Sequence, residues 1–441
     1  MRDKFKRAIE EIVRAGGHPN LIGGSVRDQF LNLKPKDLDV EVFHLTVEQL
    51  IAALGAVGQP NVDDRKFGVI RLDCGLAEAV EFSLPRKDNV GERGFGGVFP
   101  GLSVREAALR RDFTFNAMSQ SLITNEIIDP FDGLRDLQAG VIRHCHDRFF
   151  REDAIRGPRG FRFAGQINGV AAPETKVIIR SMVPAIAALA PSAWWSEFEK
   201  WATRSIVPSQ GLRFLVDTGM IDVFPEIKAL IDCPQDPELH PEGDAFNHTC
   251  HTVDAAIGQG LVPVLAALCH DFGKPTHTVK CPIRDRWISP GHAEAGEAPT
   301  RSFLARIGAP KRIVEQVVEI VRQHMTHIGG GDINKKRARR LLVKLAHATV
   351  DDLFAAIEAD HSGRPPLAKG LPARAQELKA LCEEVENEIS AFVLGRHLIV
   401  EGLTPGVHFG SILRKAFTAQ INGEFSNAAE GVNWLKDSNL I

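Results

Sequence analysis

The first part of the chain combines two patterns of hydrophobic and polar positions. Residues 2–14 repeat hydrophobic side chains three and four positions apart, which predicts an amphipathic helix that ends at Gly16. Residues 38–43 alternate instead with period two, which predicts a strand. Every second residue of that strand is hydrophobic and turns toward a core, namely Leu38, Val40 and Val42. Helical and strand-like segments mixed in this way predict an α/β head.

Beyond residue 150 the pattern is helical almost throughout. Residues 231–248 are rich in Pro and Asp, which is typical of a connector between domains. We therefore expect the α+β class, with a small mixed or antiparallel sheet in the head, an all-α neck and body, and an all-α region after the connector. The expected domains are the head, the neck and body, the region after the connector and a helical tail, at 1–145, 146–235, 236–370 and 371–441.

Composition and charge narrow the class of protein. The chain has 441 residues, of which 25% are charged and 44% are hydrophobic, as in a soluble globular protein of several domains. No apolar run approaches the ~20 residues of a membrane span, so we expect no membrane association. The seven Cys lack CxxC spacing, which indicates a reducing, cytoplasmic location. Because the net charge is only −3, nucleic-acid binding would have to use local basic patches.

The alternating strand carries acidic residues on its other face. Asp37, Asp39 and Glu41 point the same way because strand side chains alternate with period two. Like charges on one face repel one another. Two interpretations follow: the face is open to solvent, or a divalent cation offsets the repulsion.

The segment before the acidic strand favours the cation. LIGGSVRDQFLNL is an apolar run, a Gly pair and then a helical pattern. Gly23 and Gly24 let backbone amides approach a ligand closely, and Arg27 adds a forked donor suited to phosphate. Such a pair of glycines alone is usually a turn. Followed by acidic residues on one strand face, it predicts a site for a triphosphate and its Mg²⁺.

These two motifs, GGSVRD and KDLDVEVF, resemble the signature of class II nucleotidyltransferases. That family contains the CCA-adding tRNA nucleotidyltransferases and the bacterial poly(A) polymerases. The resemblance implies that Asp37 and Asp39 are catalytic and bind Mg²⁺, with Glu41 as a supporting carboxylate. It also implies that the Gly turn binds the nucleotide through four residues, Gly23, Gly24, Arg27 and Asp28.

Two further motifs suggest nucleotide contacts. RRDFTFNAM contains Arg111, Asp112 and Asn116, which offer donors for phosphate and polar groups for a ribose, although an ordinary structural Arg–Asp pair is the alternative. REDAIRGPRGFRFAG repeats charged residues three apart, which on a helix share one side. These residues are Asp153, Arg156, Arg159 and Arg162. Pro158 disfavours the helix interior, so the helix is expected to begin later or to bend.

The chemistry of this second motif suits two bases. Cytosine and adenine each present an amine donor beside a ring-nitrogen acceptor, so a carboxylate can accept from the amine while a guanidinium donates to the ring. Guanine and uracil present the reverse pattern and would leave polar groups unpaired. In the family that this chain resembles, an E-D-x-x-R motif selects CTP and ATP. The resemblance assigns that role to Asp153 and Arg156, with Arg159 close behind.

A different chemistry follows the connector. His270 and Asp271 end an apolar helix in LAALCHDFGKP, with His248 before them and Asp360 after them. Two His and two Asp form a mixed nitrogen and oxygen site suited to Ni²⁺, Mn²⁺, Co²⁺, Fe²⁺ or Mg²⁺. The set resembles that of HD-domain phosphohydrolases, and scattered surface histidines are the alternative. Three more residues would bind phosphate or act as acid or base, namely Lys274, His292 and His324.

Together the head, the helical neck and the HD set resemble multifunctional bacterial CCA-adding proteins. The resemblance implies addition of CCA from CTP and ATP to tRNA by a monomer or homodimer, with an additional phosphatase or phosphodiesterase activity. Three alternatives stay open: an A-adding enzyme or poly(A) polymerase, an HD phosphohydrolase with an inactive head, and a tRNA-binding module without catalysis. The basic stretch 334–345 is either a tRNA phosphate contact or a solvated helix face.

Overall fold

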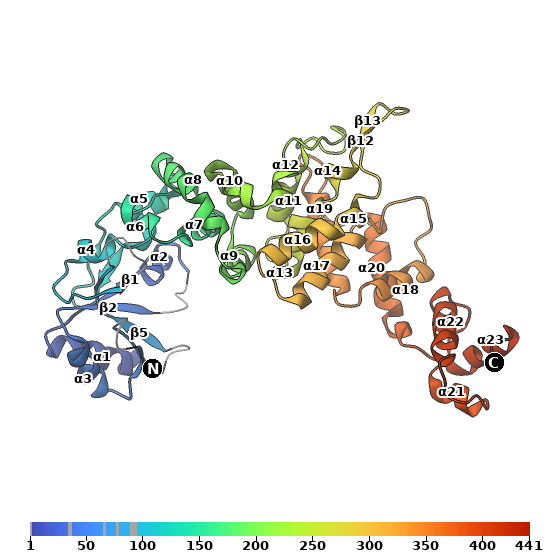
Figure 1. The fold of residues 1–441 in the computed structure, drawn as a ribbon, viewed down its shortest axis with the longest axis horizontal. Coiled ribbons are helices and arrows are strands. Elements are labelled where there is room, and N and C mark those ends of the chain that lie inside the picture. Colours follow the sequence, from blue (N-terminus) through green and yellow to red (C-terminus); the bar gives the residue numbers. More distant parts are fainter. Residues whose placement is uncertain (1, 34–37, 65–67, 76–78, 89–94) are drawn as a thin grey trace. The chain divides into compact units, whose positions relative to one another are not determined.

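A computed structural model describes residues 2–33, 38–64, 68–75, 79–88 and 95–441 (Figure 1). The chain divides into two units. The first unit contains Met1–Ala190 and Ser205–Val223, and the second contains Pro191–Arg204 and Phe224–Ile441. The domain boundaries expected after residues 145, 235 and 370 remain predictions.

The first unit is built on one mixed sheet of seven strands. Their order is β3-β4-β5-β2-β1-β8-β9, in which β2 and β5 are parallel and the other neighbours are antiparallel. The strands are β1 (His18–Ile22), β2 (Asp39–Phe43), β3 (Asn61–Asp64), β4 (Val69–Leu72), β5 (Val80–Ser83), β8 (Ser119–Ser121) and β9 (Ile127–Ile128). This arrangement confirms the predicted mixed sheet.

Helices and short strands complete the first unit. The early helices are α1 (Arg2–Arg14), α2 (Gly24–Phe30), α3 (Val47–Gly55), α4 (Val104–Ala108), the 3-10 turn η2 (Thr114–Asn116) and α5 (Gly133–Gln138). The later ones are α6 (Asp147–Arg151), α7 (Arg156–Ile167), α8 (Pro173–Ala187), α10 (Pro208–Thr218) and the 3-10 turn η3 (Met220–Val223). Two further strand pairs are β6 (Arg86–Asp88) with β7 (Phe95–Val98), and β10 (Val141–Ile142) with β11 (Val170–Ala171).

The local sequence explains the start of this unit. The amphipathic pattern forms α1, in which Ala8 and Ile12 are fully buried. The period-two pattern forms β2, in which Val40 and Val42 are fully buried as predicted. Between β1 and α2 the chain turns at Gly23, whose φ of 62° lies in the region that favours glycine. The Gly turn and the acidic strand therefore lie at one end of adjacent, antiparallel strands.

Helix α7 begins at Arg156, so Pro158 is its third residue. A proline in the first turn of a helix removes no backbone hydrogen bond, because the first N–H groups have no partner within the helix. Three small or cyclic residues in the first half of this helix are buried, namely Gly157, Pro158 and Gly160. A Cβ at Gly160 would lie 2.6 Å from Phe214, so the glycine allows α7 and α10 to pack closely.

The second unit is almost entirely helical. Its first helices are α9 (Pro191–Arg204), α11 (Pro225–Lys228), α12 (Ala245–Ala255), α13 (Leu261–Cys269), α14 (Lys274–His277), α15 (His292–Ala295), α16 (Glu297–Arg306) and α17 (Lys311–Gln323). The remaining elements are α18 (Lys335–Lys344), α19 (Val350–Ser362), α20 (Ala373–Val385), η4 (Glu386–Ile389), α21 (Gly395–Val400), α22 (Phe409–Asn422), α23 (Ala428–Asp437) and the hairpin of β12 (Val279–Cys281) with β13 (Arg286–Ile288).

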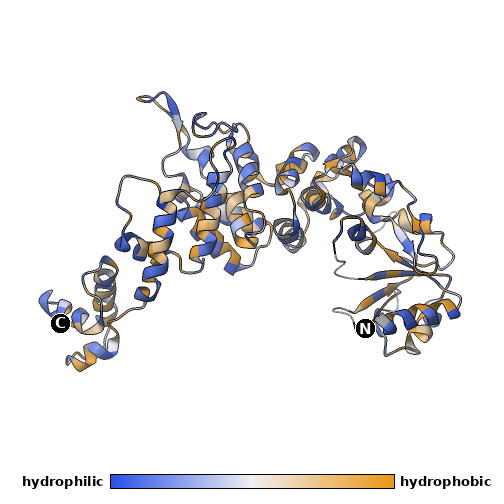
Figure 2. Cartoon of the chain, turned by 180° about the vertical axis from the view of Figure 1, so that it is seen from behind, coloured by the Kyte–Doolittle hydropathy of each residue, from blue (hydrophilic) through white to orange (hydrophobic). Residues whose placement is uncertain are grey.

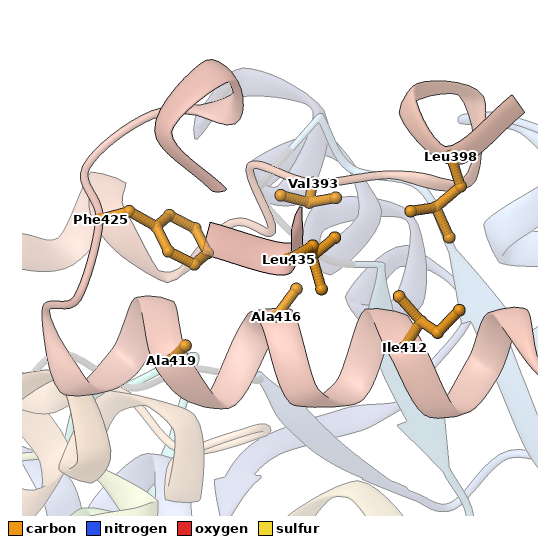
Figure 3. Packing of buried hydrophobic residues seen from close by; sticks show 7 residues of the cluster. All are labelled: Val393, Leu398, Ile412, Ala416, Ala419, Phe425 and Leu435. Carbon is orange, nitrogen blue, oxygen red and sulfur yellow. The ribbon is translucent and has the colours of Figure 1, made fainter. Parts of the chain in front are cut away.

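Most of these helices alternate hydrophilic and hydrophobic positions along their length (Figure 2). Helix α13 is the exception, because its side chains from Val262 to Cys269 are all buried, as in a helix enclosed by others. The C-terminal helices have a small hydrophobic core of their own (Figure 3). That core consists of Val393, Leu398, Ile412, Ala416, Ala419, Phe425 and Leu435. Among the described residues, no helix is long and apolar enough to span a membrane.

Candidate active sites

In the first unit, Arg27 connects the Gly turn to the motif around Asp112. Arg27 Nη1 donates to Asn116 Oδ1 at 2.7 Å. Its Nε and Nη2 donate to Asp28 Oδ1 at 2.9 and 2.6 Å. Asp28, which we expected to bind nucleotide, thus holds the guanidinium of its neighbour in place. Arg111 also lies beside the turn, because a Cβ at Gly23 would be 3.8 Å from its Nη1.

The acidic strand β2 places the carboxylate of Asp39 in a cavity near the Gly turn. Asp39 begins β2, and its backbone N–H donates to Ser25 Oγ at 3.1 Å, which ties the strand to α2. Asp39 and Glu81 are partners in the parallel pairing of β2 with β5. Both line a cavity of about 130 Å³ together with Arg110 and Arg111. Asp37, the other expected ligand, lies outside the described residues.

Glu41 is buried rather than open to the cavity. Only 3% of the residue is exposed, and its Oε1 lies 3.1 Å from Arg110 Nη2 and 3.6 Å from Arg111 Nη2. The carboxylate therefore offsets part of the positive charge of two guanidinium groups and holds them beside the central strand β2. The supporting role in catalysis that the resemblance implies for Glu41 remains a prediction.

Asp112 is the most connected carboxylate of this site. Its Oδ1 accepts from Asn116 Nδ2 at 2.9 Å and from the backbone N–H of Phe113 at 2.8 Å. Its Oδ2 accepts from Arg159 Nε at 2.6 Å. Burial alone would raise the pKa of Asp112, but Arg159 and these hydrogen bonds outweigh burial and hold the pKa well below its usual range.

The four charged residues of the REDAIRGPRGFRFAG motif differ in exposure and in hydrogen-bond partners. Asp153 precedes α7 and is exposed, so the predicted helical spacing from Asp153 to Arg156 does not hold. Arg156 donates to the carbonyl oxygens of Arg110 and Arg111 at 2.5 and 3.3 Å. Arg159 pairs with Asp112, as described above. Arg162 is 6% exposed and donates to Gln166 Oε1 at 2.8 Å.

One aromatic residue that the sequence analysis did not identify lies among these arginines. The guanidinium carbons of three arginines lie over the ring of Phe163, at 4.9 Å for Arg27, 5.6 Å for Arg159 and 3.9 Å for Arg162. Cations near an aromatic face are stabilised by the ring. Phe163 is 1% exposed, so it forms a fixed platform for the arginines. The only signal in the sequence was its place in FRFAG, beside Arg162.

In the second unit, the four expected metal ligands come together. His248 lies on α12, His270 and Asp271 follow α13, and Asp360 lies on α19. His248 Nε2 is 3.0 Å from Asp360 Oδ1 and 3.8 Å from Asp271 Oδ2. His270 Nε2 is 3.1 Å from Asp271 Oδ2 and 4.0 Å from Asp360 Oδ1. We call these four residues the HD cluster, and their convergence excludes the alternative of scattered surface histidines.

The histidines present their Nε2 atoms because their Nδ1 atoms have other partners. The Nδ1–H groups of three histidines donate to the carbonyl oxygen three residues earlier, at 2.8 Å for His270, 2.7 Å for His292 and 2.6 Å for His324. The Nε2 lone pairs of His292 and His324 then face each other at 3.1 Å. His270 Nε2 is buried without a hydrogen-bond partner. This arrangement is repulsive unless a cation or proton lies among the lone pairs.

Lys274, His292 and His324 lie beside the HD cluster as expected. Lys274 Nζ is 2.7 Å from Asp271 Oδ2, and His292 Nε2 is 3.6 Å from Asp271 Oδ1. Among the described residues, the oxygen and nitrogen atoms form three groups that could hold a metal ion: His248, His270 and Asp360; Asp271, His292 and His324; and His240, Glu242 and His248. Burial lowers the pKa of His292 and lowers that of His324 to about 3, so both are neutral at pH 7 and offer lone pairs rather than positive charge.

Glu242 is a second residue that the sequence analysis missed. Its fully buried side chain accepts from His248 Nδ1 at 2.7 Å and from His240 Nδ1 at 2.9 Å. Burial would raise the pKa of Glu242, but His240 and His248 lower it to about 2. Burial likewise opposes protonation of His248, yet the hydrogen bonds with Asp360 and Glu242 raise its pKa to about 9. Glu242 therefore fixes the ring of His248 so that Nε2 points into the cluster.

A cavity of about 390 Å³ opens onto the cluster. The cavity is lined by residues of the HD cluster and its neighbours, namely Asp271, Lys274, His292, His324 and Asp360. Arg286, Trp287 and Arg364 also line it, so the cavity offers guanidinium groups and an aromatic surface beside the carboxylates.

One family model and several known proteins match this chain in sequence. Residues 20–143 match the model of the poly A polymerase head domain. The multifunctional CCA protein of Xanthomonas oryzae pv. oryzae is 31% identical over 432 residues, which is 93% of this chain and 99% of that protein. The multifunctional CCA protein of Laribacter hongkongensis is 33% identical over 360 residues, which is 78% of this chain and 85% of that protein.

Solved structures show the same fold at lower identity. The CCA-adding enzyme of Bacillus stearothermophilus in complex with CTP has a TM-score of 0.70 at 20% identity, over 100% of this chain and 98% of that one. The CCA-adding enzyme of Thermotoga maritima complexed with tRNA has a TM-score of 0.59 at 17% identity, over 97% of this chain and 92% of that one.

Proposed function

Because this chain belongs to the family of multifunctional CCA proteins and is a tRNA nucleotidyltransferase, we propose that its first unit adds C and A from CTP and ATP at the Asp39 cavity. We further propose that the HD cluster hydrolyses a phosphate ester. The observation that supports the first activity is the meeting of a strand carboxylate with a network of arginines beside the central strand β2.

At the first site the reacting groups are the 3′-hydroxyl of tRNA and the α-phosphate of the nucleotide. The hydroxyl oxygen gives up its proton to water as it forms a new bond to phosphorus, and pyrophosphate leaves with the electron pair of the broken P–O bond. Asp39 and Glu81 supply oxygen donors of the kind that Mg²⁺ prefers, so Asp39, together with Asp37, would hold Mg²⁺. Bound there, Mg²⁺ supplies charge neutralisation to the attacking and leaving oxygens. Arg27 and Arg111 bind the triphosphate.

Base selection is assigned to Asp153, Arg156 and Arg159. Arg159 is held by Asp112, and Arg156 is held by backbone carbonyls, so both guanidiniums are positioned before a nucleotide binds. Asp153 is exposed and accepts from the backbone N–H of Ile155 at 3.2 Å. Asp153→Ala should therefore relax the choice of nucleotide and leave the fold intact.

The experiment for the first site uses a tRNA transcript that lacks its 3′ CCA. The full-length protein is incubated with Mg²⁺ and labelled CTP or ATP, separately and together. Extension by three residues with both nucleotides, followed by a stop, is the expected result. Addition of ATP only to a tRNA that already ends in CC would identify an A-adding enzyme instead, and a long A tail would identify a poly(A) polymerase. No incorporation would refute the proposal.

At the HD cluster the residues fit a divalent transition metal such as Ni²⁺, Mn²⁺ or Co²⁺. The donor set is two imidazoles and two carboxylates, and His270 Nε2 is buried without a partner. His248, His270, Asp271 and Asp360 would hold the ion, which supplies Lewis-acid activation to water and phosphate. Lys274 binds a phosphate oxygen, and Glu242 and the backbone carbonyls orient the imidazoles.

The proposed reaction is hydrolysis of a phosphomonoester or a 2′,3′-cyclic phosphate. Water adds to phosphorus, the P–O bond to the ribose breaks, and the sugar oxygen takes up a proton. Release of inorganic phosphate from a 3′-phosphorylated nucleotide, or opening of a 2′,3′-cyclic one, tests this activity in the presence of Ni²⁺, Mn²⁺ or Co²⁺. His270→Ala should abolish it. Equal hydrolysis by the variant would refute the assignment.

A further inference from the structure

A second cavity, of about 440 Å³, adjoins the cavity over the HD cluster. The two cavities share four lining residues, Ser289, His292, Met325 and Ile328. The second one, which we call the basic cavity, is also lined by four cations from α17 and α18, Arg322, Arg337, Arg340 and Lys344, and by a single acidic residue, Glu294. A ligand that extends out of the first cavity therefore meets positive charge.

The basic residues of α18 are divided between two faces of the helix. Lys335 and Arg339 are four positions apart and pair with Glu384 and Glu388, at the side that packs on α20 and η4. Their charges are neutralised within the protein. These two residues are thus structural, and they explain why a basic stretch begins this helix.

The cavity face of α18 carries cations with neutral partners. Arg337, Arg340 and Lys344 follow a spacing of three and four, which places them on one side. Arg337 donates to three backbone carbonyls, those of Thr326, of Ile328 at 3.2 Å and of Gly331 at 3.2 Å, and Arg340 donates to Asn422 Oδ1 at 2.8 Å. Lys344 donates to Gln323 Oε1 at 3.4 Å. Since these acceptors carry no charge, the three positive charges remain available to an anion.

We propose that the basic cavity binds backbone phosphates of an RNA strand whose terminal phosphate lies at the HD cluster. The inference rests on the proposed hydrolase and names its substrate class, which is an RNA end rather than a free mononucleotide. One terminal phosphate would occupy the metal and Lys274 and would leave the cations of α18 unused. Guanidinium groups suit phosphodiesters because their planar donors match two oxygens. Arg340 and Lys344 are exposed and can therefore reach a strand.

The test measures binding of a fluorescent single-stranded oligoribonucleotide with a 3′-phosphate to the full-length chain at several salt concentrations. The double variant Arg340→Ala/Lys344→Ala should bind at least 10-fold more weakly. Its salt dependence should fall by about 1.4 in the log–log slope, about 0.7 for each lost phosphate contact. Lys336→Ala is the matched control, because Lys336 is exposed on the same helix and does not line the cavity. Arg340→Lys/Lys344→Arg should restore most of the binding.

The hydrolysis readout is the ratio of kcat/KM for this oligonucleotide to that for a 3′-mononucleotide, which should fall at least 10-fold in the double variant. Unchanged binding in the double variant would overturn the proposal. An equal loss for a 3′-hydroxyl strand, with a parallel loss of CCA addition, would also overturn it, because the cations would then serve the transferase. If the wild-type chain hydrolyses neither substrate, the proposed hydrolase fails, and the binding measurement still decides whether the cavity holds RNA.

Discussion

The two candidate active sites differ in how their polar groups are paired. At the candidate site of the first unit, Glu41 pairs with two arginines, Asp112 pairs with Arg159, and Arg27 pairs with Asn116 and Asp28. At the HD cluster, by contrast, imidazole lone pairs face carboxylate oxygens and each other. Only a bound cation or proton makes the second arrangement favourable.

This difference indicates what each site requires from its ligand. In the first site the charged side chains are already paired with one another, so a nucleotide must fit between groups that are held in place. The selectivity for the nucleotide should follow from that preorganisation. The HD cluster requires a cation or a proton among its lone pairs, so metal binding should contribute to its stability as well as to its chemistry. The following predictions test this contrast, from the largest expected effect to the smallest.

The largest effect should separate the two activities. Asp39→Asn should lower nucleotide addition by about 10³-fold or more, because the metal-binding carboxylate loses its charge, and it should leave phosphate release unchanged. His270→Ala should do the reverse. Both rates are measured on the same preparations with labelled CTP and a 3′-phosphorylated nucleotide. If either variant lost both activities, the two sites would not be independent.

Because the charged side chains of the first site are paired, removing the charge of one partner should cause a large loss of stability. Glu41→Gln should lower the free energy of unfolding by about 3 kcal/mol, because it leaves Arg110 and Arg111 beside an uncharged buried group. Urea unfolding at pH 7 measures this change. Glu81→Gln is the control, since Glu81 is partly exposed and its pair with Arg71 at 3.5 Å should contribute little. Equal losses in the two variants would contradict the contrast between buried and exposed pairs.

Asp112 should make the free energy of unfolding of the first unit depend on pH in the acidic range. Its folded-state pKa is lowered, so its contribution is present above the unfolded pKa of about 3.9 and is lost as the pH falls below about 4. We expect this contribution to be about 2 kcal/mol at pH 7. Urea unfolding between pH 3 and pH 7 should show a steeper decline for the wild type than for Asp112→Asn. Parallel curves would refute the role of the carboxylate.

The smallest effect concerns the orientation of one imidazole at the HD cluster. Glu242→Gln keeps a hydrogen-bond acceptor for His248 Nδ1 but removes the charge, so the affinity for Mn²⁺ or Ni²⁺ should fall about 10-fold. Calorimetric titration of the full-length chain measures this and also gives the number of ions bound. Glu238→Gln serves as a control, because Glu238 lies in the same connector but is not a member of the ligand groups among the described residues. An unchanged affinity would show that the carboxylate only supports the fold.

Sequence reasoning predicted the class of the fold and the segments that carry the two candidate sites, because the signals for both are local. The period-two pattern of β2, the Gly turn before α2 and the adjacent His270 and Asp271 are each read within a few residues. The expected α+β class and mixed sheet are confirmed. The residue roles, including those of Asp37, remain predictions.

Reasoning from local spacing failed where the chain leaves regular structure. Asp153 was expected one helical turn from Arg156, but α7 begins only at Arg156. The pattern around Glu81 likewise does not reveal its neighbour, because it is the parallel pairing of β2 with β5 that sets Glu81 beside Asp39. Strand pairing is a property of the whole sheet, so the sequence around one strand does not reveal its neighbour.

The sequence by itself determined which chemical groups this protein has and where along the chain they gather, because side-chain periodicity and turn chemistry act over a few residues. Only the tertiary structure decided which charges are neutralised. On α18, Arg339 pairs with Glu388, 49 positions away in the chain, whereas Arg340 next to it donates to the side-chain amide oxygen of Asn422. Neighbours in sequence acquire opposite roles because a helix turns them toward different partners, and those partners come from distant segments.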